Sequence, residues 1–253
     1  MRDPCTVLQS IPGFSKARVI SRLSAGPTND SYELEQGSER FVLRVDKAEA
    51  ARLGLDRGAE KEVCELLASE GLGFAPLWFD TKGGIYLRRF LPGKTWTHRD
   101  LHRVENLARL ARLLRRLHDL PLVGKPFEPL QAASRYAKQL GTVEAAQIFA
   151  ELAHRHSQIE DVPPALCHND LVCGNILEGR ELMLIDWEYA GTGDPFFDLA
   201  VVVQHHGLGA GLARHLLGAY LGKAAGETEI RRLAAQCRFY ESLLKLWCLR
   251  TGS

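Results

Sequence analysis

The sequence lacks several features that would place it in common protein classes. No apolar run approaches the roughly 18 residues of a membrane-spanning helix, and residues 1–10 contain no apolar core of a secretion signal. The formal net charge of +1 gives no reason to expect a nucleic-acid partner. From these absences we expect a soluble, cytoplasmic protein with neither a membrane nor a nucleic acid as partner.

Paired cysteines and internal repeats are also missing. The six cysteines form no C-x-x-C pair, so neither a zinc site nor a redox dithiol is expected. Their irregular spacing is typical of reduced thiols in a cytosolic protein. The hydrophobic content of 45% is nevertheless enough to form a buried core.

The hydrophobic patterns predict two lobes. Strands are expected at 19–23, 31–35, 40–45, 77–79 and 85–90, with one helix over 58–70. The break Leu91-Pro92-Gly93 separates this part from a mainly helical part. Helices are expected at 104–118, 198–221 and 227–250, one or two more over 131–156, and a buried strand at 182–185. The prediction is an α+β fold, with an antiparallel-sheet lobe over 1–91 and a helical lobe over 92–253.

The most informative motif is His-Asn-Asp-Leu-Val-Cys-Gly-Asn at 168–175, followed by Ile-Asp-Trp at 185–187. A protein-kinase catalytic loop reads H-R-D-L-x-x-x-N, in which the Asp accepts the proton of the substrate hydroxyl and the Asn holds Mg²⁺. Asp170 and Asn175 have the same interval. A second Asp on a strand turn completes such a metal site, and Asp186 has that position.

We interpret Asp170 as the catalytic base, and Asn175 and Asp186 as Mg²⁺ ligands, because Mg²⁺ prefers hard oxygen donors. Turn capping is the alternative role for Asp170 and Asn175. The fixed order of His, Asp, Asn and a strand-borne Asp favours catalysis. We expect His168 to pack and hydrogen-bond within the loop and not to act as a base.

Residues 166–200 resemble the choline kinase, thiamine kinase and aminoglycoside phosphotransferase superfamily, and most of all its bacterial choline and thiamine kinase branch. The matching segments are Cys-His-Asn-Asp-Leu, Gly-Asn-Ile-Leu, Leu-Ile-Asp-Trp-Glu-Tyr-Ala-Gly and Asp-Pro-Phe-Phe-Asp-Leu-Ala. The resemblance implies a bilobal protein-kinase-like fold that binds ATP between its lobes. It also implies that Asp198 braces the catalytic loop from beneath.

The resemblance further implies nucleotide-binding residues in the first lobe. The loop between the first two strands offers Gly26, Thr28, Asn29 and Ser31, with backbone amides near Gly26 and hydroxyl groups as phosphate donors. It contains no G-x-G-x-x-G, and an ordinary hairpin turn would look the same. The segment Arg89-Phe90-Leu91 is expected at the hinge, where backbone groups read adenine.

Arg44 has the strand position at which protein kinases carry a lysine. An arginine there keeps its charge and grips phosphate oxygens with two donors. Glu60 is its expected partner, because Arg-Gly-Ala-Glu at 57–60 resembles the Arg-x-x-Glu of the superfamily; Glu62 is the alternative partner. A plain surface charge is the alternative role for Arg44.

The sequence indicates the acceptor alcohol less directly than it indicates the reaction. Choline and thiamine are cations, which favour aromatic faces and carboxylates. Trp187 and Glu188 follow Asp186 directly, and Tyr240 and Trp247 share one face of the last helix, although such a stripe also fits a plain core. Few acids follow Asp198, and the end at Ser253 leaves little room for an acidic lid, which weighs against aminoglycosides.

These observations predict an ATP- and Mg²⁺-dependent kinase of a small-molecule alcohol. Choline or a related amino alcohol is the first candidate, thiamine the second, and an aminoglycoside or a sugar the third. A non-catalytic nucleotide-binding protein on the same scaffold is least favoured, because Asp170, Asn175 and Asp186 are all present. The oligomeric state is not predictable from these patterns.

Overall fold

The computed structural model describes residues 2–252, which form two compact units that divide between Pro92 and Gly93. The first unit contains an antiparallel sheet of five strands in the order β1-β2-β3-β5-β4. Its strands are β1 (Arg18–Ala25), β2 (Asn29–Gln36), β3 (Glu39–Asp46), β4 (Trp78–Asp80) and β5 (Ile85–Arg89). Its helices are α1 (Pro4–Gln9), α2 (Ala48–Leu53) and α3 (Arg57–Ser69).

One face of this sheet forms an apolar core. Successive side chains of a strand point to opposite faces, so alternate residues such as Phe41, Leu43 and Val45 of β3 lie on the same side. They pack in one cluster with Val7 and Leu8 of α1. The short helix α1 therefore covers the core face of the sheet.

On the other face of the sheet, a residue of the helix α3 pairs with a side chain of β3. Asp56 caps it by accepting hydrogen bonds from the backbone nitrogens of Gly58 at 3.0 Å and Ala59 at 3.1 Å. This cap starts α3 at Arg57 and places Glu60 in its first turn. Because Arg44 lies between Leu43 and Val45 on β3, its side chain points away from the core and toward this helix turn.

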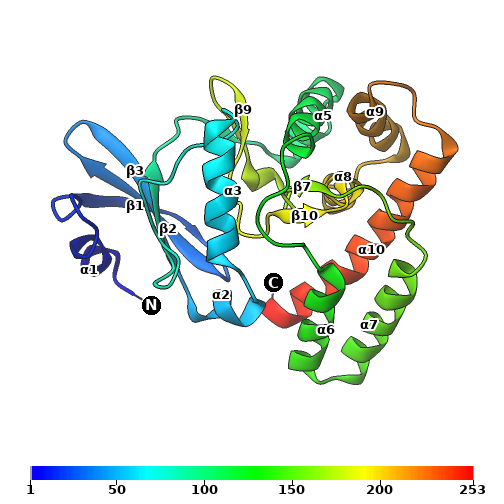
Figure 1. Cartoon of the computed structure of the whole chain (residues 1–253), viewed down its shortest axis with the longest axis horizontal. Coiled ribbons are helices and arrows are strands. Elements are labelled where there is room, and N and C mark those ends of the chain that lie inside the picture. The colour runs from blue at the N-terminus through cyan, green and yellow to red at the C-terminus, as the bar shows by residue number, and fades with distance from the viewer. Residues whose placement is uncertain (1, 253) are drawn as a thin grey trace. The chain divides into compact units, whose positions relative to one another are not determined.

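The second unit is mainly helical. Its helices are α4 (His98–Leu101), α5 (Val104–His118), α6 (Pro129–Leu140), α7 (Val143–His156), α8 (Pro195–His205), α9 (Ala210–Leu221) and α10 (Glu227–Thr251). The long helix α10 contacts α6, α7 and α8, and α5 packs on α9 (Figure 1). No helix within residues 2–252 is long and apolar enough to cross a membrane.

Two small sheets position the loops of interest in this unit. One pairs β7 (Ala165–Cys167) with β10 (Gly191–Gly193), and the other joins β6 (Lys94–Thr95), β8 (Ile176–Glu178) and β9 (Leu182–Leu184). The loop at 168–175 leads from β7 into β8 through the 3₁₀ turn η1 (Cys173–Asn175). The turn at 185–190 leads from β9 into β10.

The structure confirms the α+β class and the five predicted strands of the first unit, with ends within two residues. It also confirms the long helix at 104–118. The region 131–156 divides into α6 and α7 at Gly141, which has a φ of 66° that favours glycine. The short elements α1, α2, β7 and β10 were not predicted, because elements this short show no clear hydrophobic period.

Candidate active site

The loop at 168–175 is fixed by a buried histidine. His168 is fully buried; its Nδ1 accepts a hydrogen bond from the Asp170 backbone nitrogen at 3.3 Å, and its Nε2 donates to the Ile185 carbonyl at 3.0 Å. Burial lowers the pKa of its imidazole, which keeps the ring neutral. Both ring nitrogens are engaged, so the expected structural role of His168 is confirmed.

Asp198 of α8 braces the same loop. Its two carboxylate oxygens accept hydrogen bonds from the backbone nitrogens of His168 at 2.9 Å and Asn169 at 2.7 Å. His118, at the end of α5, donates from Nε2 to Asp198 at 3.0 Å, and its Nδ1 bonds the Tyr220 hydroxyl at 2.8 Å. This fully buried carboxylate thus ties α5 and α8 to the loop, as the resemblance implied.

The backbone of the loop and of the following turn is unusual at two positions. Asn169 and Asp186 both have a φ of 65°, in the left-handed region that few residues other than glycine adopt. The Asn169 side chain donates to the Tyr189 carbonyl at 3.0 Å, which joins the loop to the turn after β9. Backbone strain of this kind concentrates at functional sites, where surrounding contacts hold it in place.

Asn175 is oriented by Asp170. Its amide nitrogen donates to the Asp170 carbonyl oxygen and to the Asp170 carboxylate Oδ2, both at 2.9 Å. Two acceptors facing one amide group identify that group as the nitrogen. The amide oxygen of Asn175 is therefore turned away from Asp170 and is available as a ligand.

The electrostatics of Asp170 reflect its neighbourhood. Burial, and after it the negative charge of Asp186, raises the pKa of the Asp170 carboxyl to about 7. A carboxyl group with this pKa is well matched to accept a proton near neutral pH. The repulsion from Asp186 also marks a place where negative charge accumulates, which a divalent cation would neutralise.

The donor set fits a hard cation. The Asn175 amide oxygen and the Asp186 carboxylate are hard oxygen donors, the kind that Mg²⁺ prefers, so these two residues would hold the ion. His118, Cys167 and Asp198 form a second group of possible metal-ligand atoms, which all lie within 4.8 Å of one another. It belongs to the brace beneath the loop, because Asp198 already binds two backbone nitrogens and His118.

The aromatic candidates for substrate binding are mostly buried. Trp187 is 7% exposed, and its ring centroid lies 4.5 Å from that of His168. Tyr240 packs edge-on against Phe197, and its hydroxyl bonds His205 Nδ1 at 2.9 Å. Both rings pack against neighbouring side chains, which for Tyr240 agrees with the plain core that the helix stripe also fitted. A contact of Trp187 with substrate stays a prediction. Trp247 is half-buried, and Glu188 is buried at 9% exposure.

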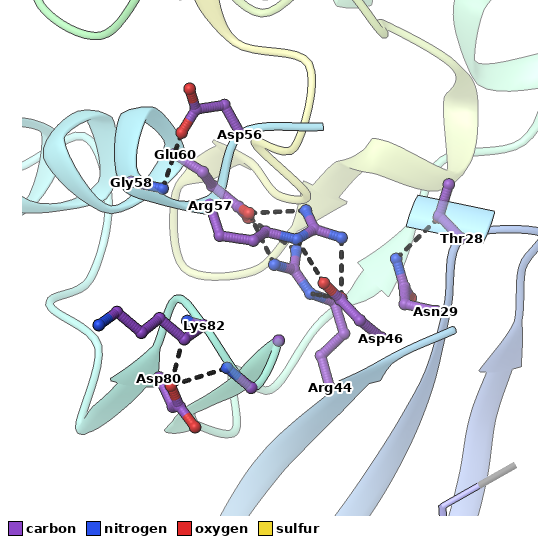
Figure 2. A network of polar contacts seen from close by, with 12 residues as sticks. Thr28, Asn29, Arg44, Asp46, Asp56, Arg57, Gly58, Glu60, Asp80 and Lys82 are labelled. Carbon is purple, nitrogen blue, oxygen red and sulfur yellow. Dashed lines mark hydrogen bonds and ion pairs between the residues drawn. The ribbon is translucent and has the colours of Figure 1, made fainter. Parts of the chain in front are cut away.

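In the first unit, Arg44 and Glu60 form a bidentate ion pair with two contacts of 2.7 Å (Figure 2). This confirms Glu60, and not Glu62, as the partner of Arg44. Arg57 donates to Glu60 at 2.8 Å and grips Asp46 with two bonds of 2.7 and 2.8 Å. All four side chains are buried or nearly so, and they fix the direction of the Arg44 guanidinium.

The candidate phosphate loop is short and tightly closed. It connects β1 to β2, and the Gly26 amide donates to the Asn29 carbonyl at 3.0 Å. The Gly26 amide thus closes the hairpin, and the contact of the loop with phosphate stays a prediction. Thr28 and Asn29 are buried and hydrogen-bonded to each other at 3.0 Å, and Ser31 lies within β2, half-buried.

At the expected hinge, the Phe90 amide donates to the Arg40 carbonyl at 2.9 Å, and the Arg40 guanidinium lies 4.1 Å from the centre of the Phe90 ring. The Arg89 side chain is exposed and pairs with Glu39. The role of Arg89, Phe90 and Leu91 near adenine, through backbone groups, stays a prediction. The Arg89 side chain and the Phe90 amide are engaged elsewhere.

Several residues that organise these sites were given no role from sequence. They are Arg57 and Asp46 beside Arg44, Asp30 and Lys47 beside the β1–β2 loop, and His118 beneath the catalytic loop. His118 carries no local signal, because its partner lies 80 positions away. The signal for Arg57 was present in the Arg-x-x-Glu segment, in which only the Glu was assigned.

Similarity to known proteins identifies the family of this chain. The model of the phosphotransferase enzyme family matches residues 19–235. Protein LicA of Haemophilus influenzae is 27% identical over 208 residues, which cover 77% of this chain and 60% of that protein. Thiamine kinase of Shigella boydii is 27% identical over 198 residues, which cover 75% of this chain and 67% of that kinase.

Among solved structures, choline kinase LicA of Streptococcus pneumoniae superimposes with a TM-score of 0.79. The match covers 92% of this chain and 86% of that protein at 21% identity, a level that shows the fold alone. The fold is therefore protein-kinase-like, as predicted. With the family model matching more than four fifths of its length, the chain belongs to the phosphotransferase enzyme family.

Proposed function

We propose that this protein transfers the γ-phosphoryl group of ATP to a hydroxyl group of a small molecule. The observation that carries this proposal is the pairing of Asp170 with Asn175 beside Asp186, on a loop that buried hydrogen bonds hold fixed. Family membership supports the same reaction class. The first unit would bind the nucleotide, and the second would supply the base and the metal ligands.

Phosphoryl transfer requires mainly that the reacting groups are positioned and that the charge of the phosphates is stabilised. Asp170 would accept the hydrogen bond of the substrate hydroxyl and take its proton as the oxygen attacks phosphorus. Asn175 and Asp186 would hold Mg²⁺, which supplies neutralisation of the phosphate charge when bound. Arg44, held by Glu60, would contact phosphate oxygens, and the backbone at Leu91 would contact adenine.

Choline or a related amino alcohol is the proposed acceptor, with thiamine next. Support comes from the similarity of the chain to a choline kinase and to a thiamine kinase. Because Trp187 and Tyr240 are packed inside the protein, the half-buried Trp247 is the candidate aromatic that retains access for a cationic group. Aminoglycosides and sugars rank below both cations.

The proposed function is tested by measuring ADP release with ATP and Mg²⁺ against choline, ethanolamine, thiamine, kanamycin and an amino sugar. We expect turnover with choline or ethanolamine, followed by thiamine. Turnover with kanamycin or the sugar would keep the reaction and replace the substrate. Absence of turnover with all five, although ATP binds, would contradict the proposed substrate range.

We also expect a strict requirement for Mg²⁺ that depends on Asp186. Removal of divalent metal with EDTA should abolish turnover, and Asp186→Asn should lower it at least about 100-fold, because a metal ligand contributes several kcal/mol to the transition state. Titration of Mg²⁺ measures the effect, and excess Mg²⁺ should partly restore the variant. The control is Glu181→Gln, an exposed acid in the turn before β9. Unchanged Mg²⁺ dependence in Asp186→Asn would remove this residue from the metal site.

A further inference from the structure

The loop between β1 and β2 is tied to the end of β3 by one lysine. Lys47, the residue after β3, donates from Nζ to the Gly26 carbonyl at 2.5 Å. Its own backbone nitrogen donates to the Thr28 carbonyl at 2.8 Å. Since the Gly26 amide already bonds the Asn29 carbonyl, both backbone groups of Gly26 are engaged, and the loop is closed from two sides.

A buried carboxylate holds this lysine in place. The Lys47 ammonium lies 3.0 Å from Asp30 Oδ1, and Asp30 is 2% exposed. Arg22 of β1 pairs with the same carboxylate. Burial alone would raise the pKa of the Asp30 carboxyl, but the hydrogen bonds from Arg22 and Lys47 outweigh burial and lower the pKa, so Asp30 stays charged.

The arrangement keeps the loop in one conformation before any ligand arrives. Fixing the backbone of a residue costs conformational entropy, and a loop ordered in advance does not incur that cost on binding. The side chain of Lys47 is 29% exposed, and its ammonium group pairs with Asp30 and donates to the Gly26 carbonyl. These contacts are those of a residue that shapes the loop.

We propose that Lys47, held by Asp30, is a positioning residue that pre-organises the β1–β2 loop for nucleotide phosphates. The inference rests on the proposed function and deepens it, because it assigns the nucleotide affinity partly to residues that do not touch the nucleotide. Substitution of either Lys47 or Asp30 should weaken the hydrogen bond to the Gly26 carbonyl and loosen the loop. The effect should be confined to ligands that carry phosphates.

The experiment measures binding of Mg²⁺–ATP and of adenosine to the full chain by titration calorimetry. We expect Lys47→Met and Asp30→Asn each to weaken ATP binding about tenfold, because each removes one charge-assisted hydrogen bond. The affinity for adenosine should be unchanged. The double variant should bind ATP no worse than the weaker single variant. Lys47→Arg, which keeps the charge, should recover most of the affinity. Lys61→Met, at a side chain that is 44% exposed, is the control.

Other outcomes separate this inference from the proposed function. If wild type binds no nucleotide, the proposed function fails before any variant is compared. If Lys47→Met weakens ATP binding but Asp30→Asn strengthens it, Lys47 contacts phosphate directly and the positioning role is overturned. Equal losses for ATP and adenosine, with a lower melting temperature, would show a purely structural role and would also overturn the proposal.

Discussion

Replacing Asp170 with alanine should lower kcat about 1,000-fold while leaving the affinity for ATP unchanged. The variant removes the group proposed to accept the proton of the substrate hydroxyl, and general-base catalysis contributes roughly 10²–10⁴-fold. Steady-state ADP release gives kcat, and calorimetric titration with ATP gives the affinity. Asp161→Ala, which removes an exposed acid seven residues from the loop start, is the control and should behave as wild type. Turnover that survives in Asp170→Ala would exclude this carboxylate as the base.

Asp170→Asn separates charge from shape. Its amide oxygen can still accept the hydrogen bond that Asn175 donates to Asp170, so the loop should remain ordered while turnover is lost. In the folded protein the pKa of the Asp170 carboxyl is raised to about 7, above its ordinary value of 3.8. Ionisation therefore disfavours the folded state, and wild-type stability should fall as pH rises from about 4 to 7.

The raised pKa of Asp170 predicts the sign of the difference in melting temperature between Asp170→Asn and wild type. In thermal melts without divalent metal, Asp170→Asn should melt higher than wild type at pH 8, and the difference should shrink toward pH 5. A variant that is more stable and inactive is the expected signature of a catalytic carboxylate that is held charged despite its burial and the repulsion from Asp186. A loss of both stability and activity would instead indicate that Asp170 serves mainly to order the loop.

The predictable part of the fold was the part with clear periodicity. The alternation in β2, the apolar run in β3 and the 3–4 spacing of α5 were enough, because each of these elements has eight residues or more. The strand β7 has three residues, all buried, and no period of two to detect. Its position is set by pairing with β10, which begins 26 positions after β7 starts and lies beyond local patterns.

The site was predictable where spacing along the chain determines distance. Asp170 and Asn175 are five apart on one loop, and the structure joins them directly. Arg44 and Glu60 could be paired only through the resemblance, since a strand and a helix bring them together. Lys47 had no such signal, because its contacts depend on the register that aligns Asn29 with Asp46 at the end of two strands.

Replacing Glu60 with alanine should destabilise the protein by about 3–5 kcal/mol, because it leaves the buried guanidinium groups of Arg44 and Arg57 facing each other without their shared carboxylate. The melting temperature should fall by roughly 10 °C. The side chain of Glu60 is 2% exposed, so water cannot replace the lost contacts. Arg44 would also lose its orientation, and the KM for ATP should rise.

Two further variants make this prediction specific. Glu65→Ala removes an exposed acid from the same helix and should change stability by less than about 0.5 kcal/mol. Glu60→Gln keeps the shape and removes the charge. Burial alone would raise the pKa of the Glu60 carboxyl, but Arg44 and Arg57 outweigh burial and lower it. The stabilising charge is therefore present above the ordinary pKa of a glutamate and is lost as pH falls through the lower folded value.

The stability difference between wild type and Glu60→Gln should accordingly stay constant above about pH 5 and shrink under more acidic conditions. Denaturant unfolding at a series of pH values measures it. A difference that grows on acidification would mean that Glu60 is held in its protonated form, and the ion pair would then not orient Arg44. A constant difference at all pH values would assign the effect of Glu60 to packing alone, and Arg44 would need another partner to hold it toward phosphate.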